Sequence, residues 1–552
     1  MGLGRKEKTQ AASEFRLGHL KSSCWRLFGI VLLPPLVFLG LTTVRLDAQG
    51  LFYDELDQAT GAFTYLGMPP WWFSLHPIHG LPLFNMTYVG ALKTAIYGLY
   101  LRFVNPEFSV LSWRMVGICF VAAGLVIFTL LSKRTISPVP LLVILGLILT
   151  DTNLLLCTRH DYGPVALGFT LRLMLIGVWL RSESVECPSP WSSFALGGLT
   201  GIAVFEKLSS LVLVLTLGWV LLFGKRRTTR HWLAAAGGVC LGALPVIFVN
   251  LESLVTRHEL FFQSYILVPN LSWGTFLHYV WAYLGLGAGK QVQYFILGSS
   301  VSPAMLGRLE PWLLLAALAF AVIYAGAHSY QRTAQLTLVA AGCYVIICVG
   351  IFLIPQNTGV HHWVIGTPFQ YVAIGLGLET LISTPPLSTK ARLLGLTTPC
   401  IAGILLVTRL VSLDFLEGAL WRGQAGRQWS PDLTELGRLA AAHVNDSIFV
   451  AADWGVGTQI LCFANGRPDF VYEPIWYYTG PETLLGLQQG GKALYAVTQN
   501  PPRGLKAENT KRIFQDLESS GYWRETPVEP EFSKLVAVKV QKFLPVSSGN
   551  VH

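Results

Sequence analysis

The stretch FYDELD, residues 52–57, follows closely on the first long apolar run of the chain and places three carboxylates within four positions. Carboxylates beside aromatic residues, just outside a membrane segment, can take a proton from an acceptor hydroxyl or hold a cation. A solvated loop start is the alternative interpretation, because acidic side chains mostly lie at the surface. We interpret this acid cluster as a polar site above the bilayer and the rest of the chain as its scaffold or partner.

Composition indicates a membrane protein. Of the 552 residues, 52% are hydrophobic and 13% are charged, and the mean hydropathy is +0.50, which is too apolar for a soluble globular chain. The formal net charge is +9, but most of the excess lies in short loops between apolar runs. Such loops set membrane orientation, so we expect no nucleic-acid partner. The nine cysteines contain no CxxC motif and predict neither a disulfide framework nor a zinc site.

Apolar runs recur along the chain, most of them long enough to cross about 30 Å of hydrocarbon. They predict about eleven membrane spans, at residues 27–44, 112–131, 138–156, 163–180, 194–205, 208–223, 232–250, 311–327, 334–354, 363–382 and 393–411. Basic residues gather in the loops on the side where the chain begins, and acidic residues in the loops on the other side. This asymmetry predicts a cytoplasmic N-terminus, and the odd number of spans then leaves the C-terminal region outside.

The same pattern divides the chain into domains. We expect a basic cytoplasmic N-terminus at 1–26, a transmembrane domain at 27–412 with outer loops at 46–110 and 251–310, and an extracytoplasmic domain at 413–552. The last of these alternates strand-like and helical stretches, which predicts a small α/β domain. Its strands are expected at 448–452, 493–497 and 534–540, and its helices at 456–464 and 509–519.

The segment 82–104 is apolar and aromatic but carries Lys93 and Arg102. We therefore expect a helix that lies along the outer interface rather than one that crosses the membrane.

Two further polar clusters fall on the predicted outer side. Arg159 and Asp161 lie between the third and fourth spans, and Glu206-Lys207 interrupts a long apolar tract. An acid opposite Asp54 would form a polar cavity suited to a substrate with a charged head and a lipid tail, and Lys207 would neutralise a phosphate. Ordinary helix ends and a tight turn are the alternative interpretations.

A histidine pair and a buried arginine complete the candidates. His361 and His362 lie in another outer loop, where they would bind phosphate, sugar or metal; because adjacent histidines cannot share one helix face, no metal site is predicted. Arg172 lies well inside its span and needs a cavity or a partner. A lipid phosphate, a carboxylate and a helix carbonyl all remain open as that partner. The glycine-containing stretch 455–460 lacks the third glycine of a dinucleotide loop, and we predict no nucleotide site there.

The order of these elements resembles the GT-C superfamily of membrane glycosyltransferases, in particular its protein O-mannosyltransferase and aminoarabinose-transferase group. The resemblance covers nearly all of residues 27–411 and rests on the Asp54-Glu55 pair, the aromatic segment 82–114, the element formed by Arg159 and Asp161, and the glycine-rich span that ends at Lys207. It departs from the family at His361-His362, where the family often has Arg-Tyr. The tail does not resemble the β-trefoil insert of eukaryotic protein mannosyltransferases.

The resemblance implies an inverting glycosyltransferase of a bacterial cytoplasmic membrane, which moves a sugar from a polyprenyl-phosphate donor to an acceptor hydroxyl on the outer face. Asp54 would be the general base, and Glu55 or Asp161 would orient acceptor or sugar. Lys207, with Arg159 or the histidine pair, would offset charge on the lipid phosphate. The acceptor would be a glycan, a lipid or a protein. No nucleotide cofactor is needed, and the use of a divalent metal stays open.

Two other classes of function compete with this one. A transporter or flippase of lipid-linked saccharides predicts broken spans with polar residues near the midplane. A non-catalytic membrane assembly protein predicts that replacing Asp54 changes no chemistry.

Overall fold

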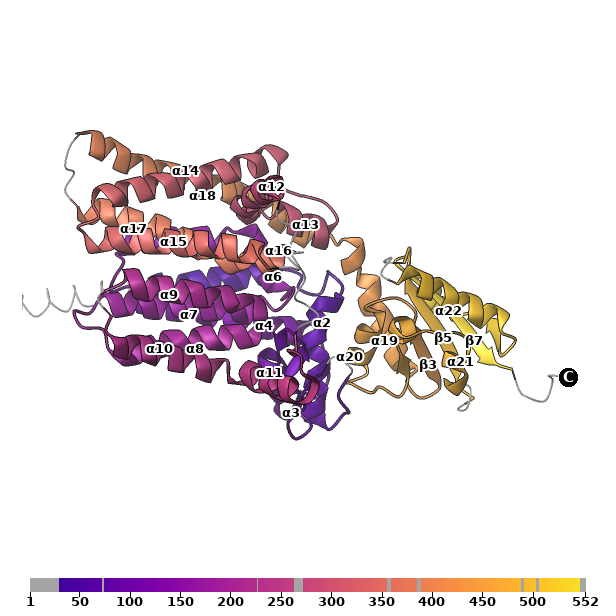
Figure 1. Cartoon of the computed structure of the whole chain (residues 1–552). Helices are drawn as coiled ribbons and strands as arrows, with labels where there is room; N and C mark the ends of the chain where they lie inside the picture. Colours follow the sequence, from indigo (N-terminus) through magenta and orange to yellow (C-terminus); the bar gives the residue numbers. More distant parts are fainter. Residues whose placement is uncertain are drawn as a thin grey trace, which may run out of the picture.

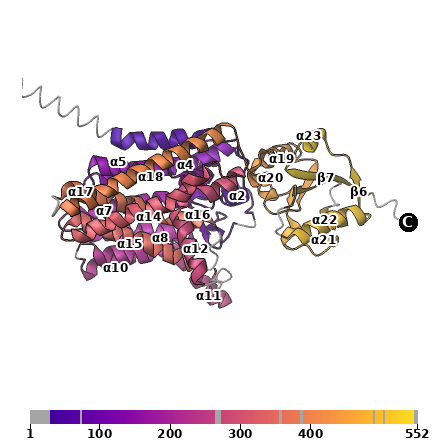
Figure 2. The ribbon, with the colours of Figure 1, turned by 90° about the horizontal axis from the view of Figure 1, so that it is seen from above.

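A computed structural model describes residues 29–71, 74–225, 227–262, 272–354, 359–384, 389–487, 491–502 and 506–546. The predicted N-terminal segment 1–26 lies outside the described residues. The chain forms a bundle of helices with a smaller sheet-containing domain at one end (Figure 1). Figure 2, which views the molecule from above, shows the same separation. The predicted combination of an α-helical body and a C-terminal α/β domain is thus confirmed.

The apolar runs form the helices of the bundle. The first helix, Gly29–Thr43, is followed by α4 (Val110–Ser132), which begins where the Ser109 side chain accepts a hydrogen bond from the Ser112 amide, a typical N-cap. The other bundle helices are α5 (Pro138–Leu149), α6 (Thr152–Arg159), α7 (Ala166–Glu183), α8 (Pro190–Glu206), η2 (Leu208–Leu211), α9 (Val212–Phe223), α10 (Thr229–Gly242), α11 (Leu244–Arg257), α12 (Trp273–Leu284), η4 (Leu286–Ala288), α13 (Lys290–Leu297), α14 (Ala304–Ala327), α15 (Arg332–Phe352), α16 (Val360–Trp363), η5 (Val364–Gly366), α17 (Phe369–Ser383) and α18 (Thr389–Trp421).

By length and composition, four of the described helices are able to cross a membrane on their own, namely α4, α14, α15 and α18. The number rises to six when two bent pairs are each counted as one span: α5 with α6, bent by 61°, and α10 with α11, bent by 69°. These pairs cover the apolar runs 138–156 and 232–250, each of which was predicted as one continuous span although the first contains Thr150-Asp151-Thr152-Asn153 and the second contains Pro245. Asp151 makes the first break, because its side chain caps α6 by accepting the Leu154 amide at 2.8 Å. The total of about eleven spans stays a prediction.

The acid cluster lies in the segment between the first helix and α4. This segment forms α2 (Tyr53–Thr60), η1 (Gly61–Leu66), β1 (Phe84–Met86), β2 (Val89–Gly90) and α3 (Leu92–Phe103). The helix expected over 82–104 therefore occupies only the second half of that range, and an antiparallel hairpin precedes it. The hairpin packs on the end of α8, where Val89 pairs with Lys207 and the Leu208 amide donates to the Tyr88 carbonyl at 3.0 Å. These contacts bring the end of α8 beside α2.

The tail domain contains a five-stranded sheet in the order β4-β3-β5-β7-β6. β3 runs parallel to β4 and β5, whereas β7 runs antiparallel to β5 and β6. Its elements are η6 (Arg427–Trp429), α19 (Pro431–Ala442), β3 (Ser447–Ala451), α20 (Val456–Phe463), β4 (Val471–Tyr472), η7 (Pro474–Trp476), α21 (Glu482–Leu485), β5 (Ala493–Gln499), α22 (Ala507–Ser519), β6 (Trp523–Thr526), α23 (Pro530–Ser533) and β7 (Val538–Pro545). One apolar core joins α19 and α20 to the sheet, and a second joins α22 to it.

The tail domain shares a core with the segment that carries the acid cluster. Leu56 and Ala59 of α2 pack in one apolar cluster with Cys462 of α20. The Gln459 side chain also donates to the Leu51 carbonyl at 3.0 Å. Helix α18 continues to Trp421, past the domain boundary expected at 412, so the tail is joined to the bundle without a long linker.

Candidate active site

A pocket opens where α2, the β1–β2 hairpin, the end of α8, the loop before α7 and helix α16 meet. Three of the site residues predicted from the sequence line it: Asp54, Lys207 and His361. The full lining consists of Asp54, Asp57, Gln58, Met86, Tyr88, Val89, Gly163, Pro164, Lys207 and His361. Residues from separate parts of the chain therefore converge in one place.

Helix periodicity decides which α2 residues reach the pocket. Asp54, Asp57 and Gln58 stand at i, i+3 and i+4, so they share one face. Asp54 is the only residue of α2 that is not buried. Its position in the first turn also suits a carboxylate, because the helix N-terminus carries partial positive charge. Asp54 thus combines solvent access with a fixed backbone position, as a general base requires.

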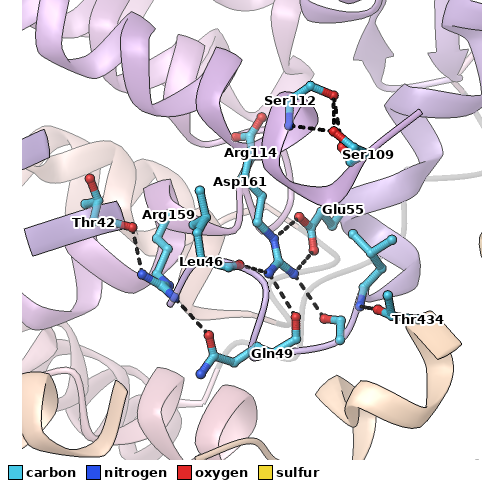
Figure 3. Close-up of polar contacts among 12 residues, drawn as sticks. Thr42, Leu46, Gln49, Glu55, Ser109, Ser112, Arg114, Arg159, Asp161 and Thr434 are labelled. Carbon is cyan, nitrogen blue, oxygen red and sulfur yellow. Dashed lines mark hydrogen bonds and ion pairs between the residues drawn. The ribbon is translucent and has the colours of Figure 1, made fainter. Parts of the chain in front are cut away.

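Glu55 points away from the pocket and is fully buried. Arg114 of α4 binds both of its carboxylate oxygens, at 2.7 and 2.9 Å. The same guanidinium donates to the carbonyls of Leu46, Gln49 and Gly50 at 2.6 to 3.0 Å (Figure 3). The buried charges are therefore paired and hydrogen-bonded, which is the condition for such a pair to be tolerated. The pair fixes α2 and the loop before it on α4.

Asp161 lies beside the pocket with both oxygens engaged. One oxygen accepts the amides of Val165 and Ala166 at 2.8 and 2.7 Å, at the start of α7. The other accepts Lys93 Nζ of α3 at 2.6 Å, and that ammonium also lies 3.6 Å from the centroid of the Trp113 ring. Sequence reasoning missed Lys93 as a site residue, since it used this lysine only as a mark of an interfacial helix. Its place inside an apolar stretch was the available signal.

Lys207 ends α8 and extends into the pocket wall. Its backbone is extended (φ −151°, ψ 119°), and its Nζ donates to the Gly163 carbonyl. Burial lowers the pKa of Lys207 to about 7, and the nearby Asp54 carboxylate opposes that shift. The ammonium is therefore held with little solvent, where an added anion would interact with it strongly.

His361 reaches the pocket from α16, its ring packed 4.3 Å from that of Tyr162. The approach depends on Gly163, whose φ is +70° and whose missing Cβ would enter the His361 ring. Burial, and after it the neighbouring His362 and Lys207, lowers the pKa of His361 well below its usual range, so the ring is neutral at pH 7. His362 does not line the pocket.

The two predicted arginines bind backbone carbonyls outside the pocket. Arg159 donates to the Thr42 carbonyl at 2.7 Å and to the Gln49 side chain at 3.1 Å (Figure 3). It also donates to the Arg45 carbonyl at 2.8 Å, at the end of the first helix. Arg172 donates to the Thr367 carbonyl at 3.0 Å. Of the partners left open for Arg172, backbone carbonyls are the ones the structure gives. Both arginines fasten chain segments next to the site.

A second, mainly apolar pocket adjoins the first. Tyr88 lines both pockets. Phe205 and Leu208, which lie on either side of Lys207 in the sequence, line the apolar pocket. Its walls are Phe84, Thr87, Tyr88, Val204, Phe205, Leu208, Val246, Asn250, Phe261 and Phe262. Across the described ranges, no group of three or more His, Cys, Asp or Glu side chains is arranged to hold a metal ion.

No family model and no curated protein sequence matches the chain. Among solved structures, the fold is similar to ArnT from Cupriavidus metallidurans bound to undecaprenyl phosphate, with TM-score 0.58 and 13% identity over 94% of this chain and 98% of that one. The apo state of the same protein gives TM-score 0.55 and 12% identity over the same shares. At this level of identity the likeness is one of fold: the chain shares the overall fold of these structures, in agreement with the fold that its order of motifs implied, and four of its described helices are long and apolar enough to cross a membrane.

Proposed function

We propose that the protein is an inverting glycosyltransferase, which transfers a sugar from a polyprenyl-phosphate donor to an acceptor hydroxyl on the outer face of a bacterial cytoplasmic membrane. The observation that carries this proposal is the meeting of Asp54 and Lys207 in one polar pocket beside an apolar one. A base, a cation and an apolar cleft together suit a donor with an anionic head and a hydrocarbon chain.

The donor side rests on Lys207. In transfer, the bond between the anomeric carbon and the phosphate oxygen breaks, and the phosphate leaves with the bonding electrons. The Lys207 ammonium offsets the negative charge that grows on it, an effect that is strong in a water-poor site. The apolar pocket takes the start of the hydrocarbon chain. The ArnT structure that binds undecaprenyl phosphate supports this class of carrier.

The acceptor side rests on Asp54. The acceptor oxygen attacks the anomeric carbon on the face opposite the phosphate, which inverts the centre, and its proton passes to the Asp54 carboxylate. His361, Arg159, Arg172 and His362 were predicted to contact substrate. Of these only His361 lines the pocket, and as a neutral ring it hydrogen-bonds sugar or phosphate. We assign the two arginines and the Glu55–Arg114 pair to holding the pocket walls in place.

A transporter of lipid-linked saccharides is the second candidate, because α5 and α6 form a broken pair with Asp151 at the bend. Near that bend two pairs of buried polar groups bind each other. Tyr371 donates to Asp151 at 2.5 Å, and Arg409 Nε donates to Glu310 at 2.8 Å. None of these four residues lines either pocket described above. The arrangement favours a structural role for the bend.

The test uses the purified protein in lipid nanodiscs, with polyprenyl-phosphate sugars as donors and release of polyprenyl phosphate as the readout. Asp54→Asn is expected to lower the transfer rate by about 10²- to 10⁴-fold, the usual contribution of a general base. Asp469→Asn, which changes an exposed acid of the tail domain, serves as the control and should leave the rate unchanged. Full transfer by Asp54→Asn would remove the proposed base.

The same variant separates the two candidate functions. In proteoliposomes, a flippase would move lipid-linked saccharide across the bilayer equally well with either residue at position 54. A wild-type protein that flips the saccharide without releasing polyprenyl phosphate would overturn the proposal in favour of transport.

A further inference from the structure

Helix α11 carries a continuous apolar face that no described part of the chain covers. The exposed residues recur at the i, i+3, i+4, i+7 spacing of a single helix face. They are Leu244, Ile247, Phe248, Leu251, Leu254 and Val255, exposed by 37% to 77%. The opposite face packs inward through Val249, Asn250 and Ser253. The helix is thus strongly amphipathic in its actual packing as well as in its sequence.

The direction of α11 differs from that of the bundle helices. It bends by 69° from α10, which packs along α8 inside the bundle. In Figure 1, α11 lies at the end of the bundle nearest the tail domain, and in Figure 2 it projects sideways from the bundle. A helix bent this far from its neighbour α10, at that end, has the direction of a helix that lies along a membrane surface.

Tryptophans mark the same end of the bundle. Trp273 and Trp281 of α12 are 72% and 38% exposed, and Trp312 near the start of α14 is 61% exposed. The rings of Trp281 and Trp312 lie 4.6 Å apart. Exposed tryptophans concentrate where headgroups meet hydrocarbon, so their position indicates the level of the membrane surface independently of α11.

We infer that α11 is an interfacial helix whose apolar face is occupied by the acyl chains of the leaflet on the tail-domain side. Helix α10 also exposes apolar side chains, Leu233 at 67% and Leu241 at 59%, as helices in contact with lipid do. The area of the α11 face also favours lipid over a second copy of the chain. A 14-residue helix is about 21 Å long and about 10 Å wide, so one face covers on the order of 200 Å². A stable protein interface buries about 800 Å² on each partner.

The inference does not depend on the reaction proposed above, but it bears on the apolar pocket. Val246 and Asn250, on the inner side of α11, form part of that pocket's wall. The pocket therefore lies within about one helix diameter, ~10 Å, of the surrounding lipid.

Site-directed quenching tests this placement. In a variant whose nine native cysteines are replaced, single cysteines at Leu251 and Val255 carry a fluorophore, and Thr256, an exposed residue outside the apolar face, is the matched control. In nanodiscs with nitroxide-labelled lipid, we expect the labels at 251 and 255 to be quenched at least threefold more than the label at 256. Iodide in the aqueous phase should give the reverse order. Equal iodide quenching at all three positions would overturn the inference.

A second measurement uses the unmodified protein. A diazirine-bearing phospholipid, activated by light in the same nanodiscs, should label the peptide 244–257 at Leu251 or Val255 and leave the buried Val249 unlabelled. Protection of this peptide, together with a dimer mass for the particle, would assign the face to a second copy of the chain and refute the lipid assignment.

Discussion

The two faces of α2 place neighbouring residues in opposite surroundings. On the pocket face, Asp54 reaches solvent beside Lys207. On the buried face, Glu55 is enclosed by α4 and held by Arg114 through two hydrogen bonds. A step of one residue turns the helix by about 100°, and that step separates a carboxylate that lines the pocket from one that is enclosed by α4 and bound to Arg114. In this pair of neighbouring acids, Asp54 is placed for chemistry, and Glu55 holds α2 in position.

A third side of α2, about 160° around the helix from Glu55, contacts the tail domain. The ring of Tyr53 packs 4.3 Å from that of Trp454, which follows strand β3. Burial raises the pKa of Tyr53 well above its usual range, and Asp57 and Glu473 add to the shift, so the phenol keeps its proton at all physiological pH values. The orientation of α2, and with it of Asp54, is therefore set jointly by the bundle and by the tail.

The largest expected effect is a difference in unfolding free energy between variants of the two acids. Glu55→Ala leaves the Arg114 guanidinium buried without its partner, which should cost about 3–5 kcal/mol of unfolding free energy. Asp54→Ala should cost under about 1 kcal/mol, because Asp54 reaches solvent. Thermal or denaturant unfolding in nanodiscs measures both. The double variant Glu55→Ala with Arg114→Met should recover part of the loss, and equal destabilisation by the two single variants would contradict the division described above.

The next effect concerns the cation on the pocket face. Lys207→Met should lower kcat/KM by about 10²-fold at pH 6, where the wild-type ammonium is charged. Because burial lowers the pKa of Lys207 to about 7, the lysine loses its charge as the pH rises through that value. The wild-type kcat/KM should then fall about tenfold per pH unit above pH 7.

Arginine provides the matched comparison for Lys207, because it keeps its charge throughout this range. Lys207→Arg is expected to lose the alkaline fall while retaining part of the activity. A wild-type rate that stays level from pH 6 to pH 9 would show that the Lys207 charge does not limit the reaction.

The smallest effect tests the tail-facing side of α2. Trp454→Ala should lower kcat by about tenfold with little change in KM, since a small displacement of Asp54 weakens catalysis more than binding. Trp454→Phe keeps an aromatic contact with Tyr53 and should restore most of the rate. Tyr477→Ala, which removes a ring that is 55% exposed, is the control. A lower yield of folded protein with an unchanged kcat would leave Trp454 with a purely structural role.

Sequence predicted the elements whose length a bilayer or an apolar core dictates. The run 112–131 became α4, Val110–Ser132, with a shift of only one or two residues at each end. The strand-like stretches 448–452 and 493–497 became β3 and β5, whereas the strand predicted from alternation at 534–540 begins later in the structure, as β7 (Val538–Pro545). Two features escaped: the bend at Asp151, because apolar residues continue on both sides, and β4, because two residues give no pattern.

The site divides in the same way. The charge asymmetry of the loops predicted that Asp54, Lys207 and His361 lie at the same membrane surface. In the structure all three line one pocket. The partners of the buried acids were not predicted. Arg114 lies 59 residues from Glu55, and Lys93 lies 68 residues from Asp161. Such pairs form through helix packing, so they cannot be predicted from the spacing of residues that are close in the sequence.

The shared core of α2 and α20 limits how this protein can be taken apart. A chimera that joined a foreign tail to this bundle after α18 would set an unfamiliar side chain where Cys462 meets Leu56 and Ala59. Even one misplaced methyl group at that seam would tilt the helix that presents Asp54. The smallest unit that can be exchanged between relatives is therefore discontinuous. It consists of the tail domain and residues 46–110, and a chimera has to replace both segments together.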